Sequence, residues 1–347
     1  GRGTADNKGQ HSIDIAALAP VMAARGGRLG FNVKVILEMG EEIGSPGLRD
    51  VCAKHKDELA ADVLIASDGP RMSAERPTVY LGSRGAFNFD LSLRLRDGGH
   101  HSGNWGGALR NPATMLAAAI ASMVDANGKN LVAGLRPPPM SAAVKAAIAD
   151  LKVGGNPGDP EVDPTWGEPG FTPEERVFGW NTLEVLAFVA GNPDIPVNAI
   201  PPEARATMQL RYVVGCDPET FVAAIETHLA ERGFSGFVVT PSRQAFAATR
   251  LDPENPWVGW ALASIARTSG KKPALLPNLG GSIPNDAFAD VLGLPTIWVP
   301  HSYPACSQHA PDEHLLGPVA REALGIMAGL YWDLGEDGNS LVKAVKA

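Results

Sequence analysis

The sequence lacks the features of a disulfide-rich, membrane-spanning or nucleic-acid-binding protein. Its 347 residues include only three cysteines, Cys52, Cys216 and Cys306, which lie far apart and form no CxxC pair. This excludes a disulfide framework and a cysteine zinc site, and it favours a reducing, cytoplasmic location. No apolar run approaches the ~18 residues that span a bilayer, so we expect no membrane association. The net charge of −8, without a Lys/Arg cluster, argues against a nucleic-acid partner.

The rest of the composition is that of a folded globular protein. Hydrophobic residues make up 44% of the chain and charged residues 20%, which is unlike a disordered chain. A chain of this length is expected to form roughly two domains, each with its own core. Glycine and proline are abundant, at 39 and 29 residues, so we expect many tight turns and loops.

Helix and strand patterns alternate at both ends of the chain. Helical spacing of apolar residues is found over 13–24, 48–59, 257–268 and 322–334. Short runs rich in Val, Ile and Leu, typical of buried parallel strands, are found at 31–39, 62–66 and 295–299. Together these parts predict one discontinuous α/β domain, residues 1–82 and 246–347, with a mostly parallel sheet.

The middle of the chain, residues 83–245, has a different pattern. Strands are expected at 87–95, 183–190, 204–214 and 237–240, and helices at 113–124 and 217–231. The resulting order β-α-β-β-α-β is that of a ferredoxin-like sandwich. We therefore expect an inserted α+β domain, with a long Pro- and Gly-rich excursion at 134–180.

Acidic and imidazole side chains lie in the loops next to the expected α/β strands. The positions in question are Asp6, Glu41, Glu42, Asp68 and His309. Ligands in α/β proteins bind at the carboxyl ends of the strands, and oxygen donors with one imidazole suit zinc, manganese or cobalt. Each position also has a plainer interpretation, because solvated turns, helix N-termini and surface loops often carry such residues.

The adjacent pair Glu41-Glu42 has a more specific chemical meaning. Two neighbouring carboxylates repel each other and are costly to bury without cations. If one of them ligates a metal ion, the other can take a proton from a water molecule as a general base. Metal-assisted hydrolysis requires this division of roles.

Six segments, taken in order, resemble the motifs of a known family. They are GRGTADNKG, LEMGEEIGSPGL, ASDGP, GHHSGNWGG, NLGGSIPNDAF and SQHAPDEH. They are similar to those of the M20 family of co-catalytic metallopeptidases, which includes carboxypeptidases, dipeptidases, acetylornithine deacetylase, succinyl-diaminopimelate desuccinylase and aminoacylase. The Gly-rich first segment lacks the Gly-Lys-Ser/Thr ending of a phosphate-binding loop.

The resemblance implies roles for the acidic and imidazole residues. Asp6 resembles the carboxylate that bridges two divalent ions, expected to be zinc with manganese or cobalt as alternatives. Glu41 resembles the general base. Glu42 and His309 resemble ligands of one ion, and Asp68 a ligand of the other.

The resemblance also implies roles for residues of the inserted domain and for one serine. His101, rather than the adjacent His100, resembles a histidine that reaches the active site of the neighbouring subunit, which implies a homodimer through residues 83–245. Asn198 and Arg211 resemble substrate-binding residues of the dipeptidase-like branch, where the arginine binds the substrate's free carboxylate. Ser282 is expected at the same end of the substrate.

In one place the chain departs from the family pattern. Family members carry a His-x-Asp segment upstream of the first motif, whose histidine is a ligand of the same ion as Asp68. The sequence given starts at Gly1, and His11 and His55 are poor substitutes. We therefore expect one ligand and the first part of the α/β domain to be missing from this sequence. A signal peptide before that part is compatible with this expectation.

These features predict a metal-dependent hydrolase that cleaves the amide bond of a dipeptide or small peptide with a free carboxylate. An N-acyl amino acid deacylase, of the acetylornithine or succinyl-diaminopimelate type, is the alternative within hydrolases. A non-catalytic relative that keeps the scaffold is the alternative from another class.

Overall fold

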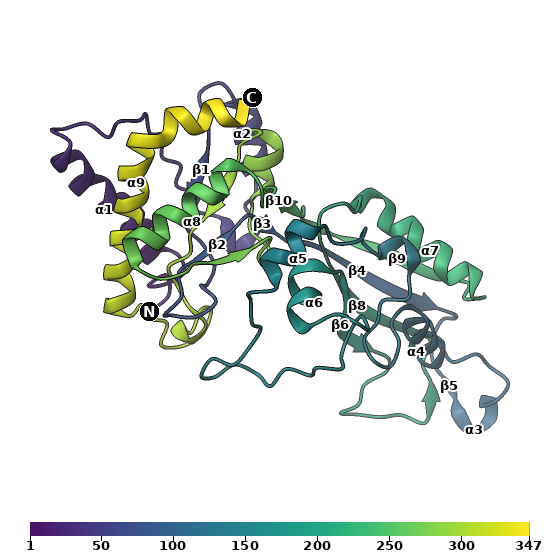
Figure 1. Cartoon of the computed structure of the whole chain (residues 1–347). Helices are drawn as coiled ribbons and strands as arrows, with labels where there is room; N and C mark the ends of the chain where they lie inside the picture. The colour runs from purple at the N-terminus through teal and green to yellow at the C-terminus, as the bar shows by residue number, and fades with distance from the viewer. Residues whose placement is uncertain (347) are drawn as a thin grey trace.

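The computed structural model describes residues 1–346 and has two lobes joined by a pair of short strands (Figure 1). The α/β lobe contains both ends of the chain, and the sandwich lobe contains the middle of the chain. The helices are α1 (Lys8–Ala24), α2 (Leu48–Lys54), α3 (Ser102–Trp105), α4 (Pro112–Met123), α5 (Ala142–Ile148), α6 (Pro173–Gly179), α7 (Phe221–Glu231), α8 (Pro256–Ser269) and α9 (Gly317–Lys346).

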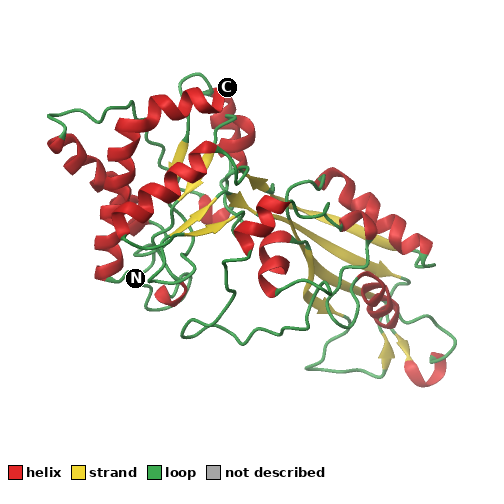
Figure 2. Cartoon of the chain, viewed as in Figure 1, coloured by secondary structure: helices red, strands yellow, loops and turns green. Residues whose placement is uncertain are grey.

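The strands of the α/β lobe are short, whereas β4, β6, β8 and β9 of the sandwich lobe are long (Figure 2). Those of the α/β lobe and the connection are β1 (Leu64–Ala66), β2 (Thr78–Tyr80), β3 (Gly82–Ser83), β10 (Thr249–Arg250), β11 (Ala274–Leu276) and β12 (Thr296–Trp298). Those of the sandwich lobe are β4 (Gly85–Arg94), β5 (His100–His101), β6 (Thr182–Val189), β7 (Ala199–Ile200), β8 (Glu203–Tyr212) and β9 (Phe237–Phe246).

The sheet of the α/β lobe has the strand order β1-β12-β2-β11. The pairs β1–β12 and β11–β2 are parallel, and β12–β2 is antiparallel. Alternate side chains go to opposite faces. Val79 and Ile297 pack with helices α1, α8 and α9, whereas Tyr80 and Trp298 pack with α2 and with residues of α5 and α6. Helices on both faces make this lobe the expected three-layer α/β arrangement.

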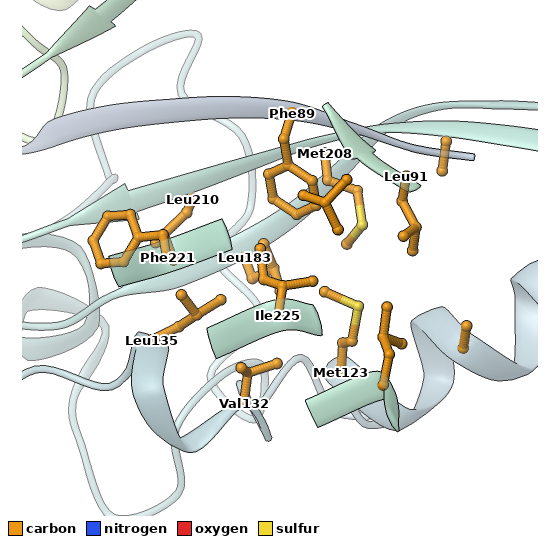
Figure 3. Packing of buried hydrophobic residues seen from close by; sticks show 14 of the residues in the cluster. Phe89, Leu91, Met123, Val132, Leu135, Leu183, Met208, Leu210, Phe221 and Ile225 are labelled. Carbon is orange, nitrogen blue, oxygen red and sulfur yellow. The ribbon is translucent and has the colours of Figure 1, made fainter. Parts of the chain in front are cut away.

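The sandwich lobe has a four-stranded antiparallel sheet in the order β6-β8-β4-β9. Its elements follow the chain as β4-α4-β6-β8-α7-β9, the expected ferredoxin-like order. Helices α4 and α7 cover one face, where Phe89, Met208 and Ile225 share a buried core (Figure 3). The other face carries polar side chains such as Asn88 and Gln209, which hydrogen-bond to each other at 2.8 Å.

Part of the excursion at 134–180 packs on the α/β lobe rather than on the sandwich. Val144, Ile148 and Phe178 share a core with Ala274 and Leu276 of β11. Strands β3 and β10 pair with each other close to the expected boundaries at 82 and 246. The division into residues 1–82, 83–245 and 246–347 stays a prediction.

The strand expected at 31–39 is wrong. These residues form no strand, and Val35, Leu37 and Met39 are exposed. An apolar pattern is not sufficient for a strand, because backbone N–H and C=O groups also need a paired neighbour. No described strand pairs with this segment.

None of the helices within residues 1–346 has the length and hydropathy needed to cross a membrane.

Candidate metal centre and active site

The carboxyl ends of β1 and β12 bring together loops that are distant in the sequence. Because the two strands are parallel neighbours, their carboxyl ends lie at the same edge of the sheet. Asp68 follows β1, and the loop after β12 carries His309. Asp6 lies just before α1, and Glu41 and Glu42 lie on a single turn of 3₁₀-helix, Glu41–Ile43.

Asp6, Glu42 and His309 form the tightest part of the site. Nε2 of His309 lies 2.8 Å from Oδ2 of Asp6 and 3.0 Å from Oε2 of Glu42. The donor atoms of the three residues all lie within 4.8 Å of one another. The second oxygen of Glu42, Oε1, lies 2.6 Å from Nη2 of Arg2. The sequence-based grouping of Glu42 with His309, and of both with Asp6, matches this geometry.

Two further carboxyl groups lie in the electrostatic field of this cluster. Burial, followed by the charges of Asp68, Glu42 and Asp6, raises the pKa of Glu41 to about 7. Burial also raises the pKa of Asp68 to about 7, with Asp6 and Glu42 adding to the rise, although the N–H of Gly69 opposes it. Such mutual repulsion among carboxylates is expected where a cation belongs.

The donor set fits a divalent ion. Two carboxylates and one imidazole are zinc ligands, and their close spacing lets one ion contact all three. Asp68 supplies a further carboxylate beside Asp6. Within residues 1–346 no second group of three His, Cys, Asp or Glu donors is gathered in this way, so the Asp68 side has the poorer donor set.

Backbone contacts hold the loops of the site in place. Nδ2 of Asn7 donates to the carbonyl oxygen of Ser67 at 2.8 Å, which ties the residue after Asp6 to the residue before Asp68. The carboxylate of Glu313 accepts hydrogen bonds from backbone N–H groups on either side of Ala5, including that of Asp6 at 2.9 Å. The roles of Asn7 and Glu313 could not be predicted from the sequence, because their partners are backbone groups, which every residue type offers.

Arg211 and Ser282 meet between the two lobes. Nη1 of Arg211 donates to Oγ of Ser282 at 2.8 Å, and Nε donates to Oε1 of Gln209 at 2.9 Å. Oγ of Ser282 donates in turn to the carbonyl oxygen of Arg84 at 2.8 Å. Burial, with the nearby charge of Arg211, lowers the pKa of Arg84 to about 10. In the described part of the chain neither arginine forms an ion pair with a carboxylate.

His101 and Asn198 lie together in a third place. Strand β5, which contains His101, pairs with β7, which begins just after Asn198, at the end of the sandwich lobe farthest from the α/β lobe (Figure 1). The carbonyl oxygen of Asn198 accepts the backbone N–H of Ser102 at 2.8 Å. The side chain of His101 is exposed and accepts the N–H of Gly103. A single chain therefore does not bring His101 or Asn198 to the cluster around Asp6.

The fold and one part of the sequence match known peptidases. Residues 81–236 match the family model of the M20 peptidase dimerisation domain. The structure is similar to that of an M20 family metallo-carboxypeptidase from Sulfolobus solfataricus, with a TM-score of 0.78 and 23% identity over 95% of this chain and 76% of the other. The chain thus carries an M20 peptidase dimerisation domain and has the M20 metallopeptidase fold, which confirms the family resemblance.

Individual relatives are dipeptidases by name. The Beta-Ala-His dipeptidase of Rattus norvegicus is 37% identical over 137 residues, which are 39% of this chain and 28% of the rat protein. The cysteinylglycine-S-conjugate dipeptidase of Corynebacterium striatum is 26% identical over 299 residues, 82% of this chain and 62% of that protein. The matches thus span less than two thirds of the length of either relative.

Proposed function

We propose that this protein is a metal-dependent hydrolase that cleaves dipeptides with a free carboxylate. The observation that carries this proposal is the convergence of Asp6, Glu42 and His309 on one point, with Glu41 beside them. We propose that Asp6, Glu42, His309 and Asp68 hold two divalent ions as cofactors. The donor set favours zinc. A bound ion supplies Lewis-acid polarisation of the substrate's carbonyl group.

Glu41 is the group available for proton transfer. It shares the 3₁₀ turn of Glu42 but is absent from the cluster of donor atoms, so it is not needed as a ligand. We assign to it the proton of the attacking water, which it passes to the nitrogen of the leaving amine. Burial is the largest cause of the raised pKa of Glu41 and does not depend on the ion, so this carboxylate is a stronger base than an exposed glutamate.

Arg211 and Ser282 are proposed to bind the substrate's free carboxylate. A guanidinium next to a hydroxyl offers convergent donors for a carboxylate. Arg211 is partly buried, and burial alone lowers its pKa, with no carboxylate among residues 1–346 contributing an opposing charge. Because buried charges are normally paired, an anionic group of the substrate is the natural partner.

A homodimer is proposed to complete the site with His101 and Asn198. The edge strand β6 exposes Val185, Leu186, Phe188 and Val189, which is costly for a monomer and typical of an interface. This strand lies within the matched dimerisation domain. The partner's copy of the β5–β7 pair would then reach the metal cluster, where His101 stabilises the oxyanion of the tetrahedral intermediate.

A substrate panel tests the proposal. The protein is freed of metal, reloaded with Zn²⁺, Mn²⁺ or Co²⁺, and assayed on β-alanyl-histidine and cysteinylglycine and on N-acetyl and N-succinyl amino acids. We expect metal-dependent cleavage of the dipeptides. A preference for the N-acyl amino acids would identify a deacylase, and no cleavage of either class by metal-loaded protein would indicate a non-catalytic relative.

The expected cytoplasmic location fits the three free thiols of the structure.

A further inference from the structure

Glu313 is a buried carboxylate whose partners are backbone N–H groups. Its side chain is 2% exposed. Oε1 accepts the N–H of Ala5 at 2.8 Å and that of Asp6 at 2.9 Å, and Oε2 accepts the N–H of Gly3 at 3.2 Å. Three charge-assisted hydrogen bonds therefore join the loop after β12 to the segment that carries Asp6.

The same loop supplies a candidate metal ligand and this backbone clamp. His309 and Glu313 are four residues apart, and His309 contacts the carboxylate of Asp6 while Glu313 holds its backbone. The loop turns sharply between them, since His309 and Asp312 have φ values of 58° and 63°. Side chain and main chain of Asp6 are thus fixed by two residues of one loop.

The clamp also controls what the carboxylate of Asp6 can do. Aspartate side chains often accept hydrogen bonds from neighbouring backbone N–H groups, which would turn them away from a metal ion. Here the N–H groups of Ala5 and Asp6 are both occupied by Oε1 of Glu313. Ala5 is itself fully buried, in a small apolar cluster with Tyr303 and Cys306, so the segment has little freedom to rearrange.

We infer that Glu313 is a positioning residue for the metal centre: by holding the backbone of residues 3–6, it presents the carboxylate of Asp6 to the ion shared with Glu42 and His309. This inference rests on the proposed metal site. It predicts that Glu313 acts on metal affinity through Asp6 and leaves substrate binding at Arg211 unchanged. A role confined to stabilising the fold would leave metal affinity unchanged.

The test compares Glu313→Gln with Asp312→Asn. Both changes remove one negative charge from the same loop, but Asp312 is exposed and Asn is well suited to its left-handed backbone. In Glu313→Gln an amide group replaces one of the two accepting oxygens, so at least one hydrogen bond to residues 3–6 is lost. Zinc affinity is measured by competition with a chelator, and amide hydrogen exchange of residues 3–6 is measured in metal-free protein.

We expect Glu313→Gln to bind zinc about 10- to 100-fold more weakly, the usual effect of removing a group that orients a ligand, and to exchange the amides of residues 3–6 faster. With saturating zinc, kcat should fall while KM changes little. Asp312→Asn should match wild type throughout. Wild-type zinc affinity in Glu313→Gln overturns the inference, even if its thermal stability is reduced.

A second variant covers the case in which Glu313→Gln does not fold. Glu313→Asp keeps the charge but shortens the reach by one methylene, and a weaker zinc affinity than that of Asp312→Asn again supports the inference, whereas equal affinities overturn it. Failure of the wild-type protein to bind zinc at all would instead contradict the proposed function. The two failures are therefore distinguishable.

Discussion

Arg211 of the sandwich lobe donates from Nη1 to Oγ of Ser282 in the α/β lobe, at 2.8 Å. The two residues are 71 positions apart in the sequence, and their contact lies where the polar face of the sandwich sheet meets the neighbouring lobe. The two proposed donors for a substrate carboxylate therefore lie on opposite sides of the junction between the lobes. Movement of one lobe relative to the other would alter this subsite.

Arg211→Ala should therefore weaken the use of substrates that have a free carboxylate. Loss of a charge-assisted contact costs about 3 kcal/mol, or roughly 100-fold in kcat/KM. C-terminally amidated dipeptides should be poor substrates of the wild type and should be hardly affected by the change. The measurement is kcat/KM for acid and amide forms of one dipeptide.

Arg205→Ala is the matched control for this experiment. Arg205 lies on the same strand and the same face as Arg211 but is exposed and paired loosely with Asp90, at 3.6 Å. It should leave kcat/KM within about twofold of wild type, as expected for an exposed pair. Equal losses for acid and amide substrates in Arg211→Ala would show that Arg211 supports the fold rather than the carboxylate.

Glu41→Gln should separate metal binding from catalysis. The side chain keeps its size and is not one of the clustered donors, so zinc content should stay near that of wild type. Loss of the general base should lower kcat by about 10²- to 10⁴-fold. Zinc stoichiometry and kcat are measured on the same preparation.

Glu58→Gln serves as the control, because Glu58 is an exposed glutamate that pairs with His55 at the surface. Glu58→Gln should change neither the zinc stoichiometry nor kcat. A Glu41→Gln protein with full zinc content and most of its activity would exclude Glu41 as the base.

Several features of the site could be predicted from the sequence. Met208 and Leu210 alternate with Arg211 along β8 and lie in the core of the sandwich lobe, so the two-residue period of a strand puts Arg211 on the opposite face. The family resemblance implied that Asp6, Glu42 and His309 share one site, and the structure brings the three side chains together. Local rules alone explain less of this grouping: Asp68 and His309 do lie in loops that follow strands, but no described strand precedes Glu42.

Other features depend on contacts that the local sequence does not encode. The run at 31–39 has the composition of a strand but no paired neighbour among the described strands. Glu313 binds N–H groups about 310 positions away, and any residue type offers such groups. His101 and Asn198 lie beside each other because β5 pairs with β7, yet their proposed role requires a second chain.

A mixture of two inactive variants tests whether His101 acts in the active site of the other subunit. His101→Ala should lack oxyanion stabilisation, and Glu41→Gln should lack the base. In a hybrid dimer the site with an intact Glu41 receives His101 from the other subunit. Random exchange makes about half of the dimers hybrid, each with one intact site, so about a quarter of the wild-type activity should return.

The control mixes His101→Ala with a protein that carries both changes, because no hybrid of these two has an intact site. It should recover no activity. If subunit exchange is demonstrated by mass and the first mixture also recovers none, His101 does not act on the neighbouring subunit.

The metal-free protein should become less stable as pH rises through about 7. The pKa values of Glu41 and Asp68 are both raised to about 7, from ordinary values of 4.5 and 3.8. A folded state with raised pKa values binds more protons than the unfolded chain, so the free energy of unfolding falls as pH rises. The contribution of these groups is complete below the unfolded pKa values and is lost as pH passes through about 7.

Urea unfolding with a chelator present should therefore show lower stability at pH 8 than at pH 6, by about 1 kcal/mol for each of the two groups. Since the two carboxyls repel each other, they should titrate as a pair rather than separately. The double variant Glu41→Gln/Asp68→Asn has neither group and should lose this part of the pH dependence, while other titrating groups act equally in both proteins. Saturating zinc should reduce the difference in the wild type, because the ion offsets the repulsion among the carboxylates. Identical pH profiles of the metal-free wild type and double variant would show that the carboxylates are too well solvated to repel, and would remove the electrostatic argument for a cation at this site.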